Sequence, residues 1–125
     1  MVRYGVVGCG MMGREHIRNI AFLPRTKIVG IFEPDPEMCE LAKLILPDAK
    51  FFKSLQSLLE NVEFDCLVVA TPNYRHIDDL SEIFKRTNKP ILIEKPIVTT
   101  LEDTKKLANF SKKYQAPVWV AMEYR

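Results

Sequence analysis

The stretch Tyr4-Gly5-Val6-Val7-Gly8-Cys9-Gly10-Met11-Met12-Gly13 decides the fold of this chain. It starts as an apolar, β-type run and ends in three glycines spaced G-x-G-x-x-G, after which a helical pattern begins at once. Each glycine has its own task in such a unit: Gly8 permits a tight turn, Gly10 lets the backbone approach a pyrophosphate, and Gly13 lets the helix pack closely on the strand. The stretch therefore predicts a dinucleotide site.

The helix that follows the glycines supplies the anion-binding groups. Backbone N–H groups at a helix N-terminus have no partner within the helix, and the helix dipole favours negative charge there. We therefore expect Met11 and Met12 to contribute to the pyrophosphate site. Because glycine-rich turns are common, the context of the pattern decides its meaning.

That context is an acid at the end of the next predicted strand. Residues 27–32 form a second apolar run that ends at Glu33, 20 residues after Gly13. A carboxylate at this place can accept hydrogen bonds from a ribose diol. It would repel a 2′-phosphate, and Pro34-Asp35-Pro36 brings no cation to neutralise one, so we expect NAD to be preferred over NADP.

Two alternatives remain for this acid and loop. Glu33 could be a solvated carboxylate at a strand end. Methyltransferases that bind S-adenosylmethionine can also place a glycine-rich loop after the first strand and an acid after the second. The third glycine, Gly13, argues against a methyltransferase.

The composition indicates one globular domain and excludes several classes of function. The 125 residues contain 47% hydrophobic and 27% charged residues, with a net charge of +2. These values are ordinary for a soluble domain, and no basic stripe indicates a nucleic-acid partner. No apolar run approaches the roughly 20 residues of a membrane span, and no signal pattern opens the chain. We expect no membrane partner and a cytoplasmic location.

The three cysteines predict free thiols. Cys9, Cys39 and Cys66 are odd in number, form no C-x-x-C pair and have no clustered histidines. Neither a disulfide framework nor a metal site is expected from this arrangement.

Strand and helix patterns alternate along the whole chain. Predicted strands cover residues 3–7, 27–32, 50–52, 66–70, 90–93 and 118–122. This alternation predicts the α/β class, and six strands joined by right-handed crossovers predict a Rossmann-type doubly wound parallel sheet in the order 3-2-1-4-5-6. We expect residues 1–125 to form a single dinucleotide-binding domain.

The helical patterns carry their own signals. Polar residues that precede them are expected N-caps: Asp35, Ser54, Asn73 and Thr100. The first helix has apolar spacing that predicts an inward face made of Met12, His16, Ile17, Ile20 and Ala21. Because His16 lies on this face, we expect a packed imidazole whose hydrogen bonds are satisfied, rather than a chemical role.

Ligands bind doubly wound sheets outside the carboxyl ends of the strands. Polar and glycine residues interrupt the apolar runs at five such places, which are the glycine loop, Glu33, 71–73, 94–96 and 123–125. We expect the site to form where these segments meet.

The chain resembles the Gfo/Idh/MocA oxidoreductases, which include glucose-fructose, inositol and other sugar dehydrogenases. The resemblance covers the whole chain and rests on four features: the glycine loop with His16, Ala70-Thr71-Pro72-Asn73-x-x-His76, Glu94-Lys95-Pro96, and Arg125 after the sixth strand. The Glu-Lys-Pro element is the most specific of them.

The resemblance implies roles for several residues. In the family the lysine lies beside the nicotinamide and the reacting hydroxyl, which implies that Lys95 is catalytic, and the preceding glutamate contacts the nicotinamide ribose. His76 is expected either at the cofactor or as a surface or capping residue of a first helical turn. The residues expected at the cofactor are Gly8, Gly10, Met11, Met12, Gly13, Glu33, Thr71, Pro72, Asn73, His76, Glu94, Pro96 and Arg125.

The chemistry suits a lysine. An ammonium beside an alcohol oxygen stabilises the alkoxide that develops as hydride leaves the carbon. Without the resemblance, Lys95 would be read as a solvated cation at a strand end.

The family also implies what lies outside this sequence. Its members continue into an α/β domain that binds the substrate and commonly forms the oligomer interface. We therefore expect an excised domain, fragment or truncated product, inactive alone, of a homo-oligomeric enzyme that moves hydride between NAD and a sugar, polyol or inositol-like alcohol. The alternative is a non-catalytic nicotinamide-nucleotide binding or sensor module.

Overall fold

One parallel sheet runs through residues 1–122, the part of the chain that the computed structural model describes. Its order is β3-β2-β1-β4-β5-β6, which confirms the predicted topology and fold class. Each strand end lies within one residue of its predicted place. The strands are β1 (Val2–Val7), β2 (Thr26–Phe32), β3 (Phe51–Phe52), β4 (Cys66–Val69), β5 (Ile91–Glu94) and β6 (Val118–Ala121).

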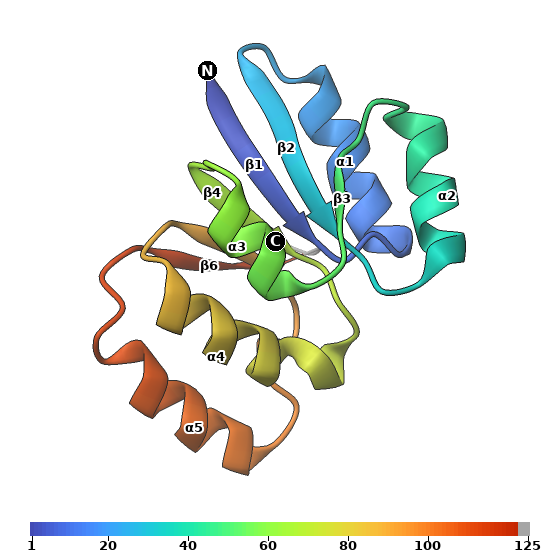
Figure 1. The fold of residues 1–125 in the computed structure, drawn as a ribbon. Helices are drawn as coiled ribbons and strands as arrows, with labels where there is room; N and C mark the ends of the chain where they lie inside the picture. The colour runs from blue at the N-terminus through green and yellow to red at the C-terminus, as the bar shows by residue number, and fades with distance from the viewer. Residues whose placement is uncertain (123–125) are drawn as a thin grey trace.

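Helices connect the strands and cover both faces of the sheet. They are α1 (Met11–Phe22), α2 (Pro36–Ile45), α3 (Leu55–Asn61), α4 (His76–Arg86) and α5 (Leu101–Ser111), with a short 3₁₀ turn, η1 (Asn73–Arg75), before α4. In Figure 1, α1 and α2 pack on one face, and α3, α4 and α5 pack on the other. This is the layering that right-handed crossovers produce on either side of the first strand.

Two hydrophobic clusters fill the space between the sheet and these helix layers. Val6 belongs to a cluster with Ile17 of α1 and Ala42 of α2, whereas its neighbour Val7 packs with Leu58 of α3 and others. Successive residues of a strand point to opposite faces, so the central strand β1 is buried on both sides. The apolar, non-alternating second half of β1, Gly5-Val6-Val7, follows from this double burial.

Three of the four predicted helix caps are confirmed. The side chains of Asp35, Ser54 and Thr100 accept hydrogen bonds from backbone N–H groups of their helices, at 2.9–3.0 Å. The fourth prediction was wrong, because Asn73 opens η1 and caps nothing. The Arg75 N–H instead donates to the Pro72 carbonyl oxygen at 2.9 Å, so the chain makes a 3₁₀ turn before α4 begins.

The inward face of α1 is narrower than predicted. Gly13, Ile17 and Ile20 are buried, whereas Met12 is 40% exposed and Ala21 is exposed. Met12 belongs to the first turn of the helix, where it lines a cavity instead of the core. The buried stripe of α1 is therefore the i, i+4, i+7 row that faces the sheet.

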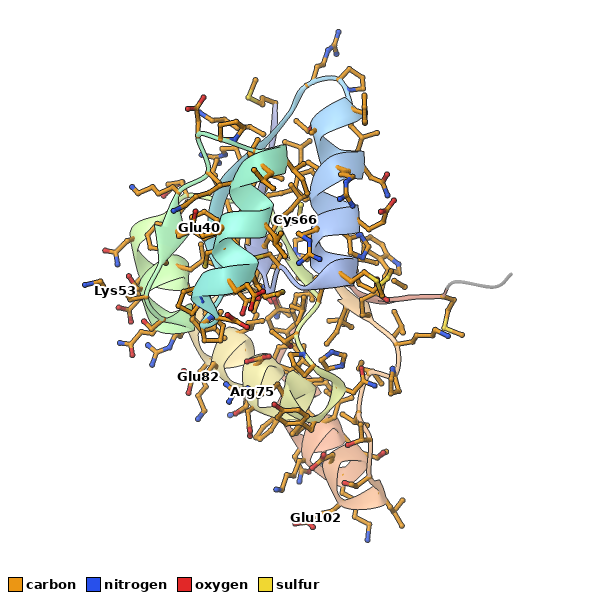
Figure 2. All side chains as sticks on the ribbon, turned by 90° about the vertical axis from the view of Figure 1, so that its right-hand side faces the viewer. Glu40, Lys53, Cys66, Arg75, Glu82 and Glu102 are labelled. Carbon is orange, nitrogen blue, oxygen red and sulfur yellow. The ribbon has the colours of Figure 1, made fainter. Side chains whose placement is uncertain are left out.

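Charged side chains project outward around the molecule, as Glu40, Lys53, Glu82 and Glu102 do in Figure 2. Within residues 1–122, none of the helices has the length and apolar character needed to traverse a bilayer. All three cysteines are free thiols, as predicted.

Candidate functional site

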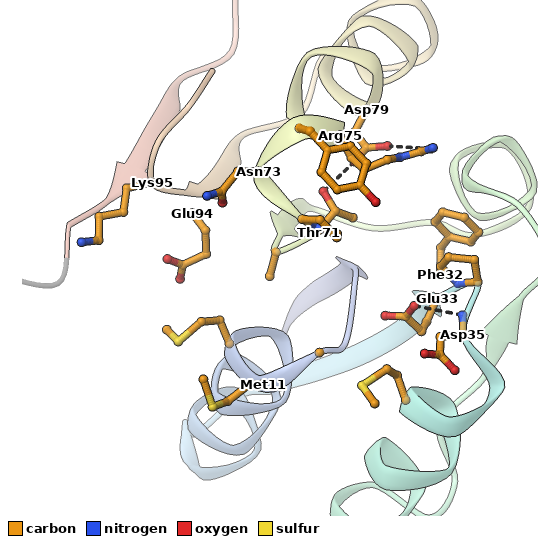
Figure 3. A pocket seen from close by; sticks show the side chains of 17 residues that line it. Met11, Phe32, Glu33, Asp35, Thr71, Asn73, Arg75, Asp79, Glu94 and Lys95 are labelled. Atoms are coloured by element: carbon orange, nitrogen blue, oxygen red, sulfur yellow. Dashed lines mark hydrogen bonds and ion pairs between the residues drawn. The ribbon is translucent and has the colours of Figure 1, made fainter. Parts of the chain in front are cut away.

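A cavity of about 710 Å³ opens where the carboxyl ends of the central strands meet the start of α1. Figure 3 shows Lys95, Glu94 and Asn73 at one end of it and Glu33 and Asp35 at the other, with the first turn of α1 between them. The lining residues are Gly10, Met11, Met12, Phe32, Glu33, Pro34, Asp35, Met38, Ala70, Thr71, Pro72, Asn73, Tyr74, Arg75, Asp79, Glu94 and Lys95.

The glycine loop at the middle of the cavity has the geometry that its spacing predicts. Gly8 has φ +92°, a left-handed conformation that favours glycine. A Cβ atom on Gly13 would lie 2.1 Å from the Gly8 carbonyl oxygen, so the helix can pack against the loop only without a side chain there. A Cβ atom on Gly10 would meet no atom within 4 Å. The position of Gly10, the second glycine, is therefore open, and it lines the cavity.

The start of α1 fits a pyrophosphate. Gly10 is the N-cap of the helix, and no side chain caps its N–H groups. The first turn carries no acidic residue, so nothing there repels an anion. An open cradle beside Gly10 and uncapped N–H groups at Met11 and Met12 are what a dinucleotide phosphate requires.

Glu33 is fixed at the end of β2 by two backbone donors. Its Oε1 accepts from the Cys9 N–H at 2.8 Å, and its Oε2 accepts from the Asp35 N–H at 3.0 Å. The first bond links the acid directly to the glycine loop, 24 residues away along the chain. A carboxylate oriented in this way presents its remaining lone pairs to the cavity, where a ribose diol would lie.

Three side chains that are linked by a hydrogen bond and an ion pair form one wall of the cavity. The Thr71 hydroxyl donates to Asp79 Oδ2 at 2.6 Å, and Arg75 Nη2 lies 3.8 Å from Asp79 Oδ1. Asp79 is only 2% exposed. Burial raises the pKa of the Asp79 carboxyl, and the Thr71 hydroxyl and the Arg75 charge oppose that rise. The group holds the β4–α4 connection against the cavity.

The end of β5 supplies the second side-chain contact of the site. Glu94 Oε1 lies 2.5 Å from His16 Nε2, which projects from α1. Lys95 follows Glu94, is exposed and lines the same end of the cavity. His16 is therefore a largely buried imidazole with a hydrogen-bond partner, as predicted, and that partner is a carboxylate of the site.

His76 does not line the cavity, in contrast to its expected place at the cofactor or on the surface. Its side chain is fully buried, with Nδ1 2.7 Å from the Pro96 carbonyl oxygen and Nε2 3.0 Å from the Thr71 carbonyl oxygen. The imidazole thus lies behind the wall of the cavity, between the segments that follow β4 and β5. His76 is the first residue of α4, and its buried side chain contributes no surface to the cavity.

The structure brings most of the predicted residues together. Gly8, Gly13 and Pro96 lie next to the lining without forming it, and Arg125, with the rest of 123–125, falls outside the described residues. Sequence reasoning missed Asp79 and Arg75. Their i, i+4 spacing could have signalled a pair on one helix turn, but it does not say which side of the helix faces the cavity.

The thiol of Cys9, in the glycine loop, is unreactive at neutral pH. Cys9 is fully buried, and burial, reinforced by the neighbouring Glu33 carboxylate, raises the pKa of its thiol to about 12. The thiol therefore stays protonated at neutral pH and is no nucleophile. Among residues 1–122 no three His, Cys, Asp or Glu side chains gather in a way that could hold a metal ion.

Comparison with known proteins gives this geometry a family. A family model described as "Oxidoreductase family, NAD-binding Rossmann fold" matches residues 2–122. The chain is 32% identical over 113 residues to the rhizopine catabolism protein MocA of Rhizobium meliloti, with 90% of this chain and 35% of the relative covered. It is 36% identical over 103 residues to the 2,7-anhydro-N-acetylneuraminate hydratase of Escherichia coli, with 82% and 27% covered.

A solved structure agrees with the fold. The myo-inositol dehydrogenase of Lactobacillus casei, determined in complex with NAD(H) and myo-inositol, matches with a TM-score of 0.86 and 31% identity, covering 97% of this chain and 36% of that one. The chain therefore spans about a third of the length of these relatives. It belongs to the Gfo/Idh/MocA oxidoreductase family, as the NAD-binding Rossmann domain.

Proposed function

We propose that this domain binds NAD(H) in preference to NADP(H) and serves hydride transfer between the nicotinamide and a sugar, polyol or inositol-like secondary alcohol. The observation that carries the proposal is the cavity that joins an oriented carboxylate, an uncapped helix N-terminus and a lysine. Glu33 would receive the adenosine ribose, Met11 and Met12 the pyrophosphate, and Glu94 the nicotinamide ribose.

The cofactor preference follows from the charge at Glu33. Its carboxylate would face a 2′-phosphate, and two like charges in this partly enclosed site repel one another. Arg75 also lines the cavity, but its guanidinium lies 3.8 Å from the Asp79 carboxylate. The proposed preference therefore requires that Arg75 stays paired with this carboxylate and does not pair with a 2′-phosphate.

Lys95 would act on the substrate oxygen. The nicotinamide, when bound, supplies the hydride-accepting carbon. The Lys95 ammonium would donate a hydrogen bond to the alcohol oxygen and stabilise the negative charge that forms as the alcohol loses its proton. An ammonium has no lone pair with which to accept a proton, so this proton must go to another group. We place that group, and the walls of the substrate pocket, outside this chain.

The substrate class and the partners belong to the same proposal. The names of the relatives support sugar-like molecules, although they describe different reactions, among them an inositol dehydrogenase and a hydratase. We infer a small-molecule substrate that reaches Lys95 through a further domain of a homo-oligomeric cytoplasmic enzyme. A non-catalytic nucleotide-binding module would keep Glu33 and the glycine loop but would have no use for Lys95.

Calorimetric titration of this chain with NADH and NADPH tests the cofactor. Tighter binding of NADH is expected, and equal or tighter binding of NADPH would overturn the preference. The reaction is tested by adding inositols, polyols or sugars and NAD to the natural gene product that contains this chain, and following reduced-nicotinamide absorbance. Turnover that Lys95→Ala abolishes supports the enzyme, whereas binding without turnover on any of these alcohols supports the module.

A further inference from the structure

We propose that His16 is a positioning residue for the nicotinamide half of the cofactor and acts through Glu94. The inference rests on the proposed function, because it assigns a ligand group to the Glu94 carboxylate. It concerns a residue that does not line the cavity and that sequence reasoning assigned to packing.

The contact itself is close and largely shielded from water. His16 Nε2 lies 2.5 Å from Glu94 Oε1, and the two side chains are only 18% and 14% exposed. A carboxylate only accepts hydrogen bonds, so Nε2 carries the hydrogen and donates. A charge-assisted bond in such surroundings is stronger than a neutral one and fixes both side chains.

The bond joins two parts of the site that are 78 residues apart. His16 lies on α1, whose first turn would bind the pyrophosphate, and Glu94 ends β5, immediately before Lys95. The position of the Glu94 carboxylate is therefore set relative to the same helix that would hold the phosphates. Any ligand that spans both places meets them at a fixed spacing.

The hydrogen bond from His16 also occupies one of the two carboxylate oxygens of Glu94. Oε1 accepts the hydrogen bond from His16 Nε2. Oε2 and the remaining lone pairs can therefore accept hydrogen bonds from hydroxyl groups in the cavity that Glu94 lines. A ribose diol has two such donors. Without His16 the glutamate side chain regains rotamer freedom, and ordering it again on binding costs free energy.

This assignment predicts that His16 affects some ligands and not others. NAD and ADP-ribose carry the second ribose, whereas ADP stops at the pyrophosphate and does not reach Glu94. We expect His16→Leu to weaken the binding of NAD and of ADP-ribose about ten-fold, which is the effect of losing a hydrogen bond to a charged group. The affinity for ADP should not change. His16→Gln, which restores an N–H donor at similar reach, should recover most of the loss.

The experiment is a calorimetric titration of the wild-type chain and its variants with NAD, ADP-ribose and ADP. Asn19→Leu, an exposed change on the same helix, serves as the matched control and should alter none of the three affinities. In a Glu94→Ala background, His16→Leu should weaken ADP-ribose no further, because its effect passes through the carboxylate. Thermal unfolding of each variant verifies that it is folded.

Two results would overturn the inference while leaving the cofactor proposal intact. One is an equal loss of affinity for ADP and for ADP-ribose in His16→Leu, which would show that the substitution affects α1 as a whole. The other is unchanged NAD binding in that variant. A wild-type chain that binds none of the three ligands would instead refute the proposed function, and the role of His16 with it.

Discussion

Replacement of Gly10 by valine should weaken NAD(H) binding strongly and destabilise the fold only slightly. A Cβ atom at this position meets no atom within 4 Å, and the backbone there, with φ −65° and ψ −161°, is open to any residue. Gly10 is, however, the N-cap of α1, where valine is a poorer residue than glycine. We expect the free energy of unfolding to fall by only about 1 kcal/mol.

The effect on binding should be much larger. The valine methyl groups would enter the part of the cavity that the pyrophosphate must reach, and they would keep it away from the N–H groups of Met11 and Met12. Two hydrogen bonds to a charged group contribute about 1.5–3 kcal/mol each. Their loss, about 3–6 kcal/mol, corresponds to about 10²- to 10⁴-fold weaker NAD(H) binding. Gly10→Ala should show a smaller loss.

Calorimetry with NADH and urea unfolding, applied to the same samples, measure the two effects. Gly13→Ala is the contrasting variant, because its Cβ would lie 2.1 Å from the Gly8 carbonyl oxygen and the loop would have to move. That variant should lose stability and binding together. Normal NADH affinity in Gly10→Val would show that the phosphate site lies elsewhere and would refute the assignment of the glycine loop.

Three further predictions concern other residues. Glu33→Ala should weaken NADH and narrow the difference from NADPH in calorimetry; an unchanged difference would mean that another group selects the cofactor. Lys95→Ala should leave NADH affinity unchanged, and this chain alone should bind NAD(H) but should not reduce NAD when inositols or hexoses are added. Turnover by the wild-type chain that vanishes in Lys95→Ala would contradict the assignment of the proton acceptor to another domain. Hydrogen bonds from the Arg3 guanidinium and backbone N–H lower the pKa of Asp65 to about 2, so the stabilisation is present above the unfolded-state pKa of roughly 3.9 and is lost as pH falls toward about 2. Asp65→Asn should flatten that acid dependence in urea unfolding; an equally steep loss would assign it to other carboxylates.

The sequence predicts a structural feature best where that feature depends only on residues close together in the chain. Asp35, Ser54 and Thr100 cap their helices because each accepts a backbone hydrogen bond from two or three residues ahead. The Asn73 prediction used the same rule and failed, since the adjacent Pro72 carbonyl accepts the Arg75 N–H and starts a 3₁₀ turn. A nearby backbone group outcompeted the expected cap.

By itself the sequence determined the strand order, the turn at Gly8, the close packing at Gly13 and the acid at the end of β2. These features follow from glycine sterics, from hydrophobic periodicity and from the length of one strand–helix–strand unit, all of which act over short stretches of chain. Only the tertiary structure decided that His16 contacts Glu94, and that His76 lies buried between the carbonyl groups of Thr71 and Pro96. The physical reason is that parallel strands place their carboxyl ends side by side, so groups 20 to 78 residues apart along the chain come into contact, and a local sequence pattern does not record such contacts.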